Sequence, residues 1–195
     1  MKRGIIFGIA GPTASGKTTV AKHLAETLGA HRAKYSDILI DLAKARRLTI
    51  DKATLQAISN EVRAQNGNDY LGLMLWKRLE TVETKTLVIE GNRLMDDMKF
   101  LERIAEEEGK DLVLIYIDAD TDTRFARMNG RLKETGASQI SRETFETLEA
   151  DPCEEELPFV RDYIKRYGTV IDSADLSIEV LLAKIEQVIA PETVA

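Results

Sequence analysis

One stretch constrains the fold of this chain more than any other, the eight residues from Gly11 to Thr18. They read GPTASGKT, which has the G-x-x-x-x-G-K-[ST] spacing of a phosphate-binding loop. In such a loop the glycines let backbone N–H groups curl around phosphate. The lysine brings positive charge to the β- and γ-phosphates, and the final hydroxyl can ligate Mg²⁺. We therefore expect Lys17 to be catalytic and Thr18 to be a metal ligand. The residues expected to bind the phosphates are Gly11, Pro12, Thr13, Ala14, Ser15, Gly16, Lys17, Thr18 and Thr19.

The residues on either side of the loop have the pattern that this chemistry needs. Residues 4–10 form a short apolar run, which is typical of a buried parallel strand. Apolar residues recur at helical spacing over 20–28, and Gly29 can end that helix. The loop is thus predicted to join a strand to a helix, whose free N-terminal amides and dipole face the phosphates.

The same alternation of strand and helix continues along the chain. Apolar strands are predicted at 4–10, 31–35, 86–89, 112–117 and 168–171, with helices between them. This pattern favours an α/β fold with a parallel sheet covered on both faces, folded as a single domain over 1–195. Right-handed crossovers place the carboxyl ends of all strands, and the phosphate loop, at one edge of the sheet.

Charged residues follow the strands at that edge. Glu90 comes directly after an apolar strand, an arrangement that holds Mg²⁺ or its waters in phosphate-loop proteins, and Arg93 offers a planar fork suited to phosphate. Asp37 has two interpretations. It can cap the next helix, for which Ser36 is equally suited, or it can face the ligand crevice and orient an acceptor group.

Three arginines follow the central strand at 112–117. Arg124 is expected to contact the phosphates or the adenine side, and Arg127 and Arg131 to close over the phosphates. The polar segment after them, at about 127–155, is interpreted as a mobile lid. Its acidic run at 151–156 is expected to stay outside the site, because carboxylates would repel a triphosphate.

The composition of the chain limits the kinds of partner that it can bind. The net charge of −6 argues against general nucleic-acid binding, which needs a basic face. No segment approaches the 18 apolar residues of a membrane span, so no membrane partner is expected. The lone Cys153 fits a reducing compartment, and we expect a cytoplasmic protein that is a monomer or homodimer.

Together these motifs resemble the P-loop small-molecule kinases of the nucleoside monophosphate kinase type. Dephospho-coenzyme A kinases and phage-type deoxynucleoside monophosphate kinases share this organisation. The resemblance implies a P-loop NTPase three-layer sandwich with strand order 2-3-1-4-5, an acceptor-binding helical segment at about 38–83 and a lid at about 127–155. It also implies ATP and Mg²⁺ as cofactors and a nucleotide-like small molecule as phosphate acceptor.

The sequence departs from this family at two positions. The family often has Asp-x-x-Arg after the second strand, but here Ile40 stands at the arginine position; Arg46, Arg47 or Arg63 could replace it. Where the family often has Asp-Gly after the third strand, this chain has Glu90-Gly91, a longer carboxylate whose metal contact can run through water.

Three functions follow from these observations. The first is transfer of the γ-phosphoryl group of ATP to a nucleoside or deoxynucleoside monophosphate. The second is a dephospho-coenzyme A kinase-like reaction, in which Asp37 helps deprotonate an acceptor hydroxyl. The third, from another class, is a nucleotide-dependent regulatory NTPase that acts through a partner protein. A GTPase is disfavoured because the chain has no N-K-x-D motif.

Overall fold

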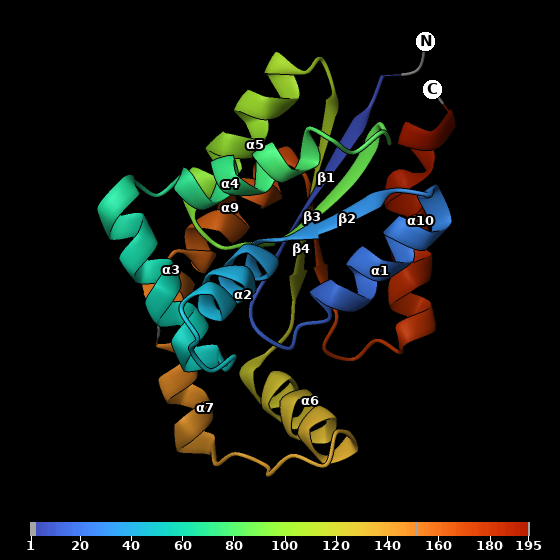
Figure 1. Ribbon diagram of the computed structural model, residues 1–195. Coiled ribbons are helices and arrows are strands. Elements are labelled where there is room, and N and C mark those ends of the chain that lie inside the picture. Colours follow the sequence, from blue (N-terminus) through green and yellow to red (C-terminus); the bar gives the residue numbers. More distant parts are fainter. Residues whose placement is uncertain (1–2, 151, 195) are drawn as a thin grey trace.

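The computed structural model describes residues 3–150 and 152–194, and of Cys153 and residues 191–194 only the backbone. Its centre is a parallel five-stranded sheet with the order β2-β3-β1-β4-β5 (Figure 1). This is the predicted order, and each predicted apolar run forms a strand. The strands are β1 (Ile5–Ala10), β2 (His31–Lys34), β3 (Thr86–Asn92), β4 (Asp111–Asp118) and β5 (Thr169–Asp172).

Helices connect the strands in the predicted alternation. The phosphate loop leads directly into the first of them. The acceptor-binding segment expected at about 38–83 covers most of the second and all of the third and fourth. The helices are α1 (Lys17–Leu28), α2 (Tyr35–Ala45), α3 (Lys52–Asn66), α4 (Tyr70–Leu79), α5 (Met95–Glu107), α6 (Thr121–Glu134), α7 (Arg142–Glu149), α8 (Pro152–Glu155), α9 (Leu157–Tyr167) and α10 (Ile178–Val194).

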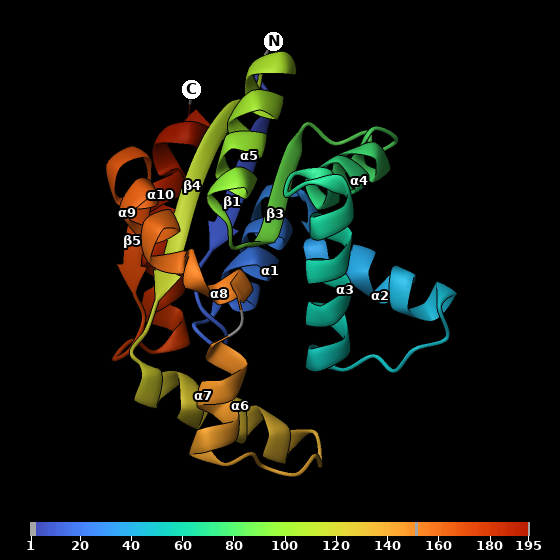
Figure 2. The ribbon, with the colours of Figure 1, turned by 90° about the vertical axis from the view of Figure 1, so that its left-hand side faces the viewer.

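Both faces of the sheet are buried. Successive side chains of a strand point to opposite sides, and helices cover each side. On one face Ile6 and Ile89 pack against α2 to α5 and α9, and on the other Phe7 and Val88 pack against α1 and α10. Figure 2 shows these helices on the two sides of the sheet. The fold is therefore the predicted three-layer α/β sandwich, and its two cores hold the carboxyl edge of the sheet in place.

An irregularity in β3 shapes that edge. The register between β1 and β3 shifts after Ile9, so that Ala10 lies opposite Asn92 and Gly91 is the extra residue, with φ +95°. The buried Asn92 amide donates hydrogen bonds to the carbonyls of Ile9 (3.1 Å) and Ile89 (2.9 Å). The bulge thus occurs between Glu90 and Arg93, where the sequence predicts functional residues.

Beyond the carboxyl edge, α6 and α7 lie together below the sheet (Figure 1). Phe145 of α7 is fully buried and packs edge-on against Phe125 of α6, with ring centroids 5.6 Å apart. The Asn129 side chain also holds the connecting loop through the backbone of Ile140. The polar segment at about 127–155 thus contains a packed pair of helices, and its movement as a lid stays a prediction.

Candidate functional site

The phosphate loop has the backbone that its glycines predict. Gly11 has φ +136°, and a Cβ there would lie 2.1 Å from the Ile117 carbonyl oxygen, so no other residue fits. Gly16 has φ +107° and precedes α1. The loop is also held from behind, because the Ser173 hydroxyl donates to the Ser15 carbonyl at 2.8 Å. The loop is thus shaped by its own glycines and fixed by the segment after β5.

Lys17 reaches back over the loop, and its Nζ donates to the carbonyl of Pro12. Burial lowers the pKa of Lys17 well below its usual value, and the nearby Arg93 lowers it further, while Glu90 acts in the opposite direction. A bound polyanion such as triphosphate would favour the charged form of this buried lysine.

Thr18 and Glu90 meet at the start of α1. The Thr18 hydroxyl donates to Glu90 Oε2 at 2.9 Å, and Glu90 is only 4% exposed. A hydroxyl beside a carboxylate is an oxygen donor set that Mg²⁺ accepts, with water and phosphate completing its shell. These two residues therefore fit the predicted magnesium site.

Glu90 also has two basic partners that sequence reasoning missed. Its Oε1 lies 3.0 Å from Arg32 Nε and 3.4 Å from Lys34 Nζ, both on the neighbouring strand β2. Residues two apart on a strand share a face, so the Arg-x-Lys spacing in the weak second strand was the available signal. These ion pairs compensate the burial of the carboxylate.

Two cavities meet at Lys17 and Thr18. The larger, about 450 Å³, extends from the phosphate loop to α2, α3 and α4, and the smaller, about 280 Å³, lies on the side of α10. Arg93 lines the larger cavity, and Arg131 lines both. Arg131 is exposed and makes no ion pair with any described residue, so it is available to an anion in either cavity.

Arg127 lines the smaller cavity but is already anchored. Its guanidinium donates to the Ser173 hydroxyl (3.0 Å), the Ser173 carbonyl (2.6 Å) and the Ser15 carbonyl (3.3 Å). In this structure it ties α6 to the phosphate loop, and its predicted role at the phosphates stays a prediction.

Arg124 does not lie where the sequence analysis expects it. Only 7% exposed, it bonds the Ala119 carbonyl (3.0 Å) and the Thr121 hydroxyl (3.1 Å), pairs with Glu149 and stacks on Phe145. It lines neither cavity. In this structure the buried side chain holds α7 against α6, and its expected contact with the nucleotide stays a prediction.

Asp37 does not have the first of its two predicted roles, that of a helix cap. The helix α2 begins at Tyr35, so Asp37 lies within its first turn and makes no capping hydrogen bond, and neither does Ser36. Asp37 lines neither cavity, although Tyr35 and Ser36 line the larger one. The helix begins two residues earlier than the polar residues suggest, so neither residue caps it, and the expected role of Asp37 toward an acceptor stays a prediction.

One residue of the acidic run at 151–156 lies inside the site, contrary to the expectation. Asp151 and the side chain of Cys153 are outside the described residues, but Glu154 is only 7% exposed. Its Oε1 accepts from the Thr13 hydroxyl of the phosphate loop at 3.2 Å and pairs with Arg93. The expectation that this run stays outside the site is wrong at Glu154, because a cation and a loop hydroxyl compensate its charge.

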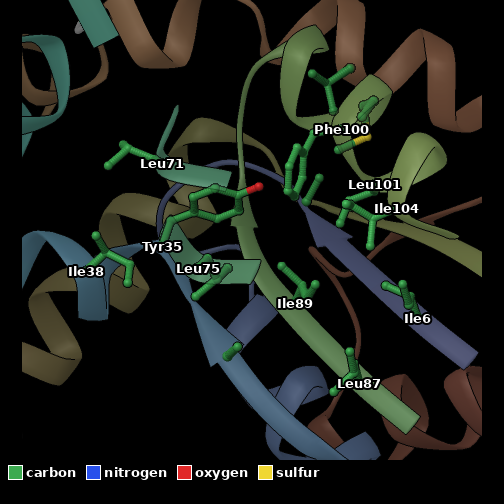
Figure 3. Close-up of a cluster of buried hydrophobic side chains, with 14 of the residues drawn as sticks. Ile6, Tyr35, Ile38, Leu71, Leu75, Leu87, Ile89, Phe100, Leu101 and Ile104 are labelled. Carbon is green, nitrogen blue, oxygen red and sulfur yellow. The ribbon is translucent and has the colours of Figure 1, made fainter. Parts of the chain in front are cut away.

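The wall of the larger cavity opposite the loop holds Tyr35, which the sequence analysis did not single out, and Arg63, which it named as a possible replacement at Ile40. Tyr35, at the start of α2, lies among Leu71, Leu75 and Ile89, and burial raises its pKa, so that the hydroxyl stays protonated (Figure 3). Arg63 of α3 also lines this cavity and pairs with Asp97 at 3.1 Å. Of the three arginines considered as replacements at Ile40, Arg63 is the one that lines the cavity.

The sheet order, the phosphate loop and the carboxyl-edge site define a P-loop NTPase fold of the kinase type. A sequence model of the family described as "AAA domain" matches residues 10–148, more than half of the chain, and the chain belongs to that family. No curated protein sequence matches it significantly.

Solved structures with the same fold include two named as kinases. A shikimate kinase from Acinetobacter baumannii in complex with shikimate is 19% identical, with a TM-score of 0.57 over 99% of this chain and 96% of that one. A gluconokinase from Sinorhizobium meliloti 1021 is 13% identical, with a TM-score of 0.56 over 98% and 94%. At these identities the likeness concerns the fold. No helix in the described part of the chain is long and apolar enough to cross a membrane.

Proposed function

We propose that this protein is a small-molecule kinase that transfers the γ-phosphoryl group of ATP to a nucleotide-like acceptor. The proposal rests on one observation above all: a single cavity joins the phosphate loop to the helices α2, α3 and α4. A protein that only hydrolyses or senses ATP has no need of a second substrate chamber opening onto the γ-phosphate position. Fold neighbours named for shikimate and gluconate phosphorylation support the proposal.

Each residue of the cavity would have its own role in such a reaction. Lys17 and the loop amides hold the β- and γ-phosphates, Arg131 adds charge from the lid side, and Arg93 faces the space between donor and acceptor. Catalysis by such a set is mainly positioning and charge stabilisation, without a covalent intermediate. Mg²⁺, held through Thr18 and Glu90, would neutralise charge on the phosphates.

Two acceptor types fit the proposal, nucleoside or deoxynucleoside monophosphates and dephospho-coenzyme A. Both place an adenine-sized or pyrimidine-sized group in a cavity whose wall is largely apolar, with Leu39, Leu55 and Leu71. Asp37 lines neither cavity, so the geometry gives it no role as the base in the second reaction.

The test is ADP release measured in a coupled assay across nucleoside monophosphates, deoxynucleoside monophosphates, their nucleosides and dephospho-coenzyme A. We expect a low basal rate with ATP and Mg²⁺ alone and a rise of at least about tenfold with the true acceptor. Slow hydrolysis that no acceptor stimulates would instead support the regulatory NTPase.

A further inference from the structure

We propose that the acceptor is uncharged where it meets Arg93 and Arg63, so that a hydroxyl, not a phosphate, receives the γ-phosphoryl group. The residue that determines this choice is Glu154. This inference rests on the proposed kinase function and chooses among its acceptors. It follows from the way in which the arginines of the acceptor side are already neutralised by buried carboxylates.

Arg93 is the first of these arginines. Its guanidinium pairs with Glu154, which α8 brings in from the far end of the lid segment (Figure 2). The carboxylate is 95% buried and also accepts from the Thr13 hydroxyl, so it lies at the junction of phosphate loop and acceptor cavity. A side-chain anion therefore already takes the cation that an acceptor phosphate would need.

Arg63 is neutralised in the same way. Its Nη2 lies 3.1 Å from Asp97 Oδ1, and the Asp97 side chain is only 1% exposed. The other oxygen, Oδ2, accepts from the backbone N–H groups of Arg93 (2.8 Å) and Leu94 (3.0 Å). Asp97 thus joins the two arginines into one network whose two positive charges are balanced by two buried negative charges.

Lys34, another cation of this cavity, shares the one carboxylate of Glu90 with Arg32. Lys17 and Arg131 line both cavities, and Lys52 of α3 donates to the Leu148 carbonyl. An acceptor phosphate would bring about two negative charges against Glu154 and Asp97 in a setting of low dielectric, where repulsion is strong. At Arg93 and Arg63, buried carboxylates thus already take the positive charge that an acceptor phosphate would use.

The remaining groups of the acceptor wall suit a neutral molecule. The Tyr35 hydroxyl and the Gln56 amide nitrogen are buried and have no hydrogen-bond partner among the described residues, and both residues line the cavity. Unpaired buried donors are costly unless a ligand satisfies them. Uncharged carbonyl or hydroxyl oxygens of the acceptor can do so, while its apolar face packs on Leu55 and Leu71.

The reaction then takes a simple form. The acceptor hydroxyl oxygen bonds to the γ-phosphorus as the bond from phosphorus to the β,γ-bridging oxygen breaks. ADP leaves, and the hydroxyl proton passes to water. A monophosphate acceptor would differ only in the nucleophile, which is why matched acceptors can separate the two cases.

The experiment uses nucleosides and their 5′-monophosphates as matched probes, which differ by a single phosphate. Binding to the full chain is measured by calorimetry with a non-hydrolysable ATP analogue and Mg²⁺ present, and turnover by ADP release. We expect the neutral member of a pair to bind at least about tenfold more tightly and to be the one phosphorylated. Tighter binding and turnover of the monophosphate would overturn the inference and leave the kinase function intact. If neither member of any pair binds or reacts, the nucleotide-like acceptor and the inference fall together.

Glu154→Gln tests the role of the residue itself, with Glu155→Gln, an exposed neighbour in the same helix, as the matched control. Removing the charge takes the Glu154 carboxylate away from Arg93, so monophosphate affinity should rise at least about tenfold and the preference for the nucleoside should shrink. Glu155→Gln should behave as wild type. If folded Glu154→Gln, checked by circular dichroism, keeps the wild-type preference, Glu154 does not set it. The wild-type comparison decides the acceptor charge even if this variant fails to fold.

Discussion

At the scale of single residues, the site depends on charges held out of water in compensated pairs. Lys17 is the exception, because burial and Arg93 lower its pKa and its main contact is a neutral carbonyl. A bound triphosphate stabilises the charged form and raises that pKa, so the complex holds more protons than the free protein. Binding should therefore take up protons, and affinity should fall as pH rises through the pKa of the free protein.

Calorimetry of ATP-analogue binding at alkaline pH, in two buffers of different ionisation enthalpy, measures this proton uptake. Lys17→Met should abolish the uptake and reduce the rate of phosphoryl transfer by roughly two to three orders of magnitude, while the fold is retained. Equal apparent enthalpies in the two buffers for the wild type would show that Lys17 does not change protonation on binding.

Glu90 supports both the proposed magnesium site and two buried cations. Glu90→Gln should lower the transfer rate more than ATP affinity, because the metal matters most as charge moves. It should also lower the free energy of unfolding by about 3 kcal/mol, since Arg32 and Lys34 lose their partner. Steady-state kinetics and denaturant unfolding separate the two effects. An unchanged rate at saturating Mg²⁺ would leave Glu90 with the structural role only.

At the scale of elements, the lid segment is fastened more firmly than its composition suggests. Arg124 and Phe145 join α7 to α6, so Arg124→Ala should loosen α7 while barely changing ATP affinity. Hydrogen exchange of residues 142–149 should quicken in this variant. A large loss of ATP affinity with unchanged exchange would instead support the nucleotide contact that the sequence predicts for Arg124.

The proposed closure of the lid then concerns its outer part. The Lys52 ammonium of α3 donates to the Leu148 carbonyl of α7 at 3.2 Å, so lid and acceptor segment already touch at one point. A bisubstrate analogue should strengthen this junction, and amides of residues 135–150 should gain protection from exchange, much less so with ATP alone. Full protection in the free protein would make the segment a fixed subdomain.

At the scale of the whole molecule, the sequence predicts what local pattern determines. Apolar strands alternating with helices predict the parallel sheet covered on both faces, and the glycine spacing predicts the loop, because these depend on neighbours along the chain. The order of the strands came from the family resemblance. Glu154 could not be predicted, since its partner Arg93 is 61 residues away and an acidic run normally lies in solvent. The surroundings of Asp37 and Arg124 are hard to predict for a related reason: they depend on where α2 begins and on how α7 packs.

The proposed activity of the whole molecule is phosphoryl transfer rather than hydrolysis. The fate of the γ-phosphate of labelled ATP measures this directly. After incubation with Mg²⁺ and the acceptor panel, the label should appear in a phosphoester of one acceptor, and Lys17→Met should abolish its formation. Label recovered only as inorganic phosphate, at a rate that no acceptor changes, would contradict the kinase function.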